Sequence, residues 1–74
     1  MDGKDAAVAK FGKKVRAARQ ARGWTQEDLA ERSRLAPVQI SRIERGAREV
    51  RLTTLLRLLS ALRTQPDRLL DGLY

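Results

Sequence analysis

Two short amphipathic stretches separated only by residues 34–36 constrain this fold more than any other feature. The first begins with "TQED", in which Thr25 can cap a helix and Asp28 can interact with free amides of the first turn. The second begins at Pro37, which suits the first position of a helix because the amide hydrogen it lacks would be unpaired there. Pro37 also disfavours a helical backbone at Ala36. We therefore expect two separate helices joined by a tight turn, the second closed by Gly46.

Three further helices are predicted around this pair. An apolar stripe of Val8, Phe11, Val15 and Ala18 indicates a first helix that ends before Gly23. The leucine-rich residues 52–62 indicate a fourth helix, and "QPDRLLDG" indicates a short fifth. Leu and Ala are abundant and β-branched residues few, which favours helix over strand. The expected fold is all-α, with a flexible tail over residues 1–6 and one five-helix domain over residues 7–74.

The charge of the chain indicates a polyanionic partner. Sixteen Lys and Arg against nine Asp and Glu give a net charge of +7 and a pI near 11.1, which is typical of nucleic-acid-binding domains. An anionic membrane is the other candidate, through a basic helix that carries Lys10, Lys13, Lys14 and Arg16. We do not expect membrane binding, because the apolar stripe of that helix is narrow and the core needs it. No apolar run approaches the roughly 18 residues of a spanning helix, so we expect a cytoplasmic protein.

The composition argues against an enzyme or a metal site. The chain contains no cysteine and no histidine, and thus lacks thiolate ligands, the commonest metal ligand and the usual general base. We expect no catalytic residue, metal or cofactor. The single tryptophan, Trp24, is expected to pack in the core, because a stacking platform for single-stranded nucleic acid would need several aromatic residues.

The helix that begins at Pro37 has two contrasting sides. At roughly 100° per residue, one side carries Ala36, Ile40, Ile43 and Glu44, and the opposite side carries Val38, Arg42 and Arg45, flanked by Gln39 and Ser41. The second side combines groups that match base edges in DNA: arginine for guanine, glutamine for adenine and valine for the thymine methyl. Two helices joined so tightly, the second one basic, form the helix-turn-helix pattern. A solvated helix face that happens to be basic is the alternative.

The stretch "GWTQEDLAERSRLAPVQISRIERG" resembles the helix-turn-helix of the phage-repressor and Cro-like family, often called XRE. The matching positions are Gly23, Thr25, Gln26, Leu29, Ala30, Ile40, Ile43, Glu44 and Gly46. The likeness continues to "PDRLLDG" and covers nearly all of the chain from about Phe11. It implies a compact five-helix domain like that of lambda repressor. It also implies a sequence-specific transcriptional regulator that binds a palindromic operator as a homodimer, with the third helix in the major groove.

Position by position, the resemblance assigns three groups of residues. The base-reading residues are Pro37, Val38, Gln39 and Arg42, and the DNA-backbone contacts are Gln26, Ser41, Arg45, Arg48 and Arg51. Gln26 is also implied to orient the third helix. Arg19 and Glu44 match a structural ion pair between the first and third helices.

Two positions depart from the family pattern. The turn position that is often glycine is Arg34, and the N-cap of the third helix is Ala36 instead of a hydroxyl residue. Each departure costs about 1 kcal/mol of stability.

The end of the sequence predicts an interface and leaves two functions open. Leu69, Leu70, Leu73 and Tyr74 supply more apolar surface than a short helix can bury, so we expect them to form the interface of a homodimer. The compact ending resembles the controller proteins of restriction–modification systems, which implies a bacterial or phage protein. The segment "LTTLLRLLSAL" resembles antitoxins instead, which neutralise a partner toxin protein and repress their own operon.

Overall fold

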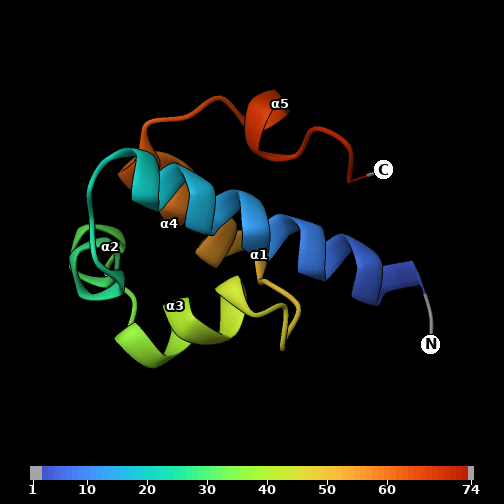
Figure 1. Cartoon of the computed structure of the whole chain (residues 1–74), viewed down its shortest axis with the longest axis horizontal. Helices are drawn as coiled ribbons and strands as arrows, with labels where there is room; N and C mark the ends of the chain where they lie inside the picture. The colour runs from blue at the N-terminus through green and yellow to red at the C-terminus, as the bar shows by residue number, and fades with distance from the viewer. Residues whose placement is uncertain (1–2, 74) are drawn as a thin grey trace.

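The structure is a computed structural model that describes the backbone of residues 3–73 and the side chains of residues 6–73. All regular structure in these residues is helical, in the order α1 (Gly3–Ala21), α2 (Gln26–Ser33), α3 (Pro37–Glu44), α4 (Leu52–Leu62) and α5 (Pro66–Leu69). Figure 1 shows α1 running across the molecule, with α3 below it, α5 above it and α4 passing behind it. The all-α, five-helix expectation is confirmed.

The first helix begins earlier than its apolar stripe predicts. α1 starts at Gly3, so residues 3–6 belong to a helix and not to a separate tail; Met1 and Asp2 lie outside the described residues. The physical reason is that Ala6 and Ala7 are strong helix formers, and extending an existing helix costs far less than nucleating one. The flexibility of this segment stays a prediction. The helix ends as expected, with Gly23 in the left-handed region at a φ of 71°.

Side chains from every helix meet in one core. Its largest fully buried members are Leu29, Ile40, Leu58, Leu62 and Val15. Phe11 and Val15 of the predicted α1 stripe are buried, and Trp24 packs against this core as expected. The guanidinium of Arg32 lies over the Trp24 ring, 4.3 Å from its centroid. The tryptophan therefore attaches the α1–α2 connection to the core. The Arg32 guanidinium occupies the face of its ring on which a nucleobase would stack.

The start of α2 is fixed by the predicted cap. The amide of Asp28 donates to Oγ1 of Thr25 at 3.0 Å, and the amide of Thr25 donates to Oδ2 of Asp28 at 2.8 Å. The hydrogen bond from the Thr25 backbone, followed by a contribution from its side chain, lowers the pKa of Asp28. The reciprocal pair satisfies two amides that would otherwise lack partners at the helix start.

This cap makes a pH-dependent contribution to stability. Because the folded-state pKa of Asp28 is below its unfolded value, the contribution is present above the unfolded pKa and is lost as pH falls through the folded one. We expect Asp28→Asn to melt at a lower temperature than wild type at neutral pH, and the difference to shrink as the pH falls below 3.8, the ordinary pKa of an aspartate. Thermal unfolding across this range measures it, with the exposed Glu31→Gln as control. An undiminished difference at low pH would contradict the assignment.

Candidate nucleic-acid interface

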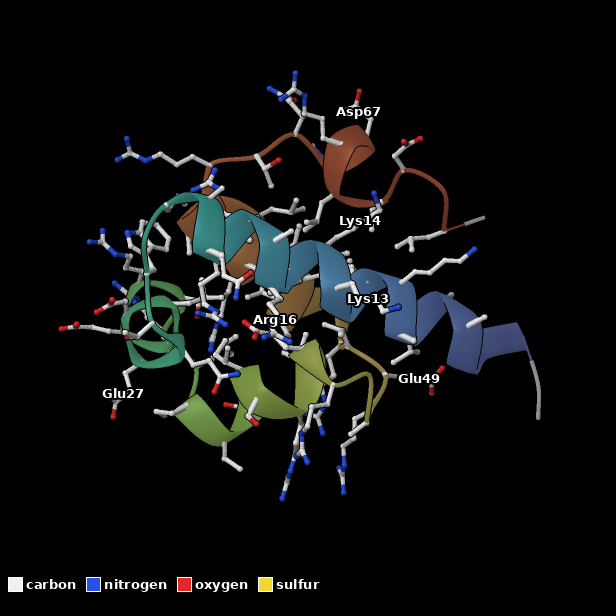
Figure 2. The ribbon with its side chains drawn as sticks, viewed as in Figure 1. Lys13, Lys14, Arg16, Glu27, Glu49 and Asp67 are labelled. Atoms are coloured by element: carbon white, nitrogen blue, oxygen red, sulfur yellow. The ribbon has the colours of Figure 1, made fainter. Side chains whose placement is uncertain are left out.

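Helix α3 divides its residues between the core and the surface as predicted, except that Ala36, expected on the core side, is the N-cap residue and is exposed. Ile40, Ile43 and Glu44 are buried, whereas the Val38 side chain is 54% exposed. The other residues of the outer side, Pro37, Gln39, Arg42 and Arg45, are exposed, and Ser41 is partly buried. In Figure 1, α3 lies at the lower edge of the molecule with no other helix below it, and Figure 2 shows nitrogen-tipped side chains extending downwards from this edge. The outer face, which we define as Val38, Gln39, Arg42 and Arg45, is therefore open to a partner.

The turn before α3 adopts the strained geometry that its sequence implied. Arg34 lies in the left-handed region, with φ 60° and ψ 39°, and Leu35 is buried beneath the turn. Ala36 provides no side-chain cap, but its amide donates to Oε1 of Gln39 at 2.9 Å. This use of Gln39 was not predicted from the sequence. Glutamine three residues after the N-cap is a known capping pattern and could have indicated it.

A basic groove lies beside the outer face of α3. It has a volume of about 450 Å³ and lies between α3, the α3–α4 loop and the first turns of α4. Four arginines line this groove, namely Arg42, Arg48, Arg51 and Arg57. The groove thus brings the predicted base reader Arg42 together with the two predicted backbone contacts of the loop. Arg45 and Gln26 do not line it.

Arg57 is a groove residue that was not predicted from the sequence. Its Nη1 atom donates to the backbone oxygen of Arg34 at 3.3 Å, so the side chain reaches from α4 to the turn before α3. A signal was present in the sequence, because Arg57 is the one charged residue in the otherwise apolar and hydroxylated segment 52–62. Thr53 and Thr54, at the start of the same helix, also line the groove.

An ion pair holds α3 against α1 and α2. Nε of Arg19 donates to Oε2 of Glu44 at 2.7 Å, and Nη2 donates to Oε1 at 3.0 Å. This hydrogen bonding, opposed by desolvation, raises the pKa of Arg19. Nε2 of Gln26 donates to Oε1 of Glu44 at 3.1 Å, and Arg19 also donates to the backbone oxygen of Trp24. The predicted Arg19–Glu44 pair is therefore present, and Gln26 contacts α3 through it.

The predicted dimer residues do not form an exposed patch. Leu69 is buried in the core of its own chain, and Leu70 and Leu73 are partly buried against that core. The expectation that Leu69 is exposed is wrong. α5 packs on α1, and this contact buries Leu69 although α5 is short. Tyr74 lies outside the described residues. The exposed leucines are instead Leu52 and Leu56 of α4, with 69% and 55% of their surface accessible.

Comparisons with known proteins place this geometry in a family. The family model described as helix-turn-helix matches residues 15–69, which is most of the chain. The chain belongs to the helix-turn-helix family. As a member, it is a DNA-binding transcriptional regulator, and the family consists of regulators and not of enzymes. None of the described helices is long and apolar enough to cross a membrane.

Two solved structures are similar to this helix-turn-helix protein over most of their length. The restriction–modification controller protein C.AhdI from Aeromonas hydrophila is 41% identical, with 86% of this chain and 97% of that chain covered and a TM-score of 0.83. The wild-type restriction–modification controller protein C.Esp1396I is 30% identical, with 90% and 87% covered and a TM-score of 0.81. A search among curated proteins found no match.

Proposed function

We propose that this chain is a controller-type regulator that binds a palindromic operator as a homodimer, with α3 in the major groove. The observation that carries the proposal is the open outer face of α3 beside a groove lined by four arginines. The major groove admits an α-helix and displays a distinct pattern for each base pair. Similarity to two controller proteins favours this role over that of an antitoxin. In this role the protein acts in the cytoplasm, on bacterial or phage DNA.

The proposed contacts fall into two classes. Pro37, Val38, Gln39 and Arg42 read base edges, because they lie on the exposed first turns of α3 or on its outer face. Ser41, Arg45, Arg48 and Arg51 contact the DNA backbone, and Gln26 does so while it supports Glu44. Arg57, Thr53 and Thr54 join the backbone class, since they line the same groove. Backbone contacts position the protein, and base contacts determine the sequence that it prefers.

Arg42→Ala tests the base-reading class. An operator is first selected from a random palindromic library with the wild-type protein, and its single-base-pair variants are then measured at one salt concentration. The guanidinium of Arg42 can donate to both acceptors of guanine, and such a contact discriminates against other bases by about 1–3 kcal/mol per half-site. We therefore expect Arg42→Ala to abolish the preference at one symmetric base pair. Alanine is a good helix former, so α3 should stay folded.

Arg48→Ala is the matched control, with the same charge change in the loop. We expect it to weaken binding to all variants alike and to make the salt dependence shallower by about one unit for each phosphate that is no longer neutralised. If Arg42→Ala also weakens every variant equally, Arg42 contacts a phosphate and the reading face is assigned wrongly. If wild-type affinity does not respond to salt, the electrostatic basis of the proposal is wrong.

We place the dimer contact on α4 and not on α5. Leu52 and Leu56 are one helical turn apart on one face, and large exposed apolar side chains of this kind mark interfaces. A two-fold axis makes such a patch self-complementary. We expect Leu52→Asp and Leu56→Asp to shift the protein from dimer to monomer in sedimentation at micromolar concentration while helicity is retained. Val38→Asp, at an exposed apolar residue of α3, should remain a dimer; dimers in all three variants would contradict this interface.

A further inference from the structure

The amide side chain of Gln39 is oriented by the start of its own helix. Ala36 is the N-cap residue of α3 and offers no side-chain acceptor, and its backbone amide donates to Oε1 of Gln39 at 2.9 Å. A backbone N–H can only donate, so the side-chain atom that faces it must be the carbonyl oxygen. This hydrogen bond therefore distinguishes the two ends of the Gln39 amide and turns Oε1 towards the helix start.

The other end of this amide remains available to a partner. In the described part of the chain, no hydrogen bond occupies Nε2 of Gln39. The residue is exposed, and its side chain lines the basic groove together with Arg42. Nε2 carries two hydrogens and accepts none. Gln39 thus has two free donors, while the Ala36 amide holds its acceptor Oε1 turned towards the start of α3.

We infer that Gln39 reads guanine in the major groove, and not the adenine that a glutamine suggests. Adenine is recognised by a glutamine through both ends of the amide, because its edge displays the acceptor N7 and the donor N6. Because Oε1 is turned towards the Ala36 amide, turning both ends of the amide to an adenine edge would pull Oε1 away from the cap of α3. Guanine displays two acceptors, N7 and O6, and both match the donors on Nε2. The inference rests on the proposed function and names the base that one residue of its site selects.

The cap and the reading role can be separated by substitution. Gln39→Glu keeps an oxygen that can accept from the Ala36 amide but removes both donors, whereas Gln39→Ala removes cap and donors together. We expect Gln39→Glu to melt at or above the wild-type temperature, since a carboxylate at a helix start is favourable. Gln39→Ala should melt lower. This difference establishes the cap independently of DNA.

The reading role is measured as a ratio of affinities on matched operators. Each protein is titrated with a set of duplexes in which one symmetric position of the selected operator is changed at a time to guanine, adenine or cytosine. The ratio within one protein cancels the general repulsion that a new carboxylate causes. We expect wild type to prefer guanine by roughly tenfold per half-site at one position. That preference should disappear in Gln39→Ala, and in Gln39→Glu it should move to cytosine, whose N4 group donates.

Three results would overturn the inference. A wild-type preference for adenine that disappears in Gln39→Ala shows that Oε1 takes part in reading. A guanine preference unchanged in both variants shows that Gln39 does not read bases. Neither of these two results contradicts the proposed function if Arg42→Ala still abolishes a preference at another position of the operator. A wild-type protein without any sequence preference overturns the inference and the proposed function together.

Discussion

Arg19→Ala is expected to lower the free energy of unfolding by about 3–5 kcal/mol, because it leaves a buried charge without its partner. The Glu44 side chain is only 3% exposed, and Arg19 donates to both of its oxygens. After the substitution, Gln26 is the side chain that still donates to this carboxylate among the described residues. Native domains have a stability of about 5–15 kcal/mol, so the effect is a large fraction of the whole.

The reverse substitution is expected to cost less. In Glu44→Ala, Arg19 keeps its hydrogen bond to the Trp24 oxygen, and its side chain is 11% exposed and can reach water. The double variant Arg19→Met/Glu44→Leu should recover part of the stability, since it leaves no buried charge. Urea unfolding at one fixed protein concentration measures the free energy of unfolding of the wild type and of these three variants. Costs below about 1 kcal/mol in both single variants would show that the pair contributes no more than a surface ion pair.

The parts of the fold that were predicted correctly depend on neighbours in the sequence. Thr25 and Asp28 cap α2 within one turn, and Pro37 sets the start of α3 through its own ring. The bounds of α4 agree with its leucine-rich segment, whereas the left-handed backbone of Arg63 that follows it is known only from the structure. Local chemistry of this kind is independent of the rest of the chain.

The parts that were not predicted depend on contacts between distant segments. Leucine recurs through α4 and α5, and its pattern does not say which members other helices will cover. Leu69 is buried because α5 packs on α1, and Leu52 is exposed because no described segment covers it. The cap made by Gln39 is an exception, because it joins residues only three apart in the sequence. Gln39 was assigned to base reading from its residue type, its place on the helix and the family resemblance, and was not considered as a capping residue. The DNA contacts themselves stay predictions for the operator experiments.

Gly12 is another residue that only the structure identifies. It is buried where α1 crosses the end of α3, and a Cβ atom added to it would lie 2.3 Å from the backbone oxygen of Ile43. The same atom would lie 2.8 Å from the backbone oxygen of Glu44. Real Cβ atoms do not approach backbone oxygens this closely, and backbone atoms cannot turn aside as a flexible side chain can. Any larger residue must therefore push α1 away from α3.

Gly12→Ala is accordingly expected to destabilise the fold by about 2–3 kcal/mol, although alanine is the better helix former by about 1 kcal/mol. Separation of the two helices would also stretch the Arg19–Glu44 pair that joins them, so operator affinity should fall in the fraction that stays folded. Gly23→Ala is the control, because nothing lies within 4 Å of its added Cβ and only its φ of 71° opposes the change. It should cost about 1 kcal/mol. If Gly12→Ala unfolds in urea no earlier than Gly23→Ala, α1 and α3 can move apart freely, and the close approach at Gly12 does not set the position of α3.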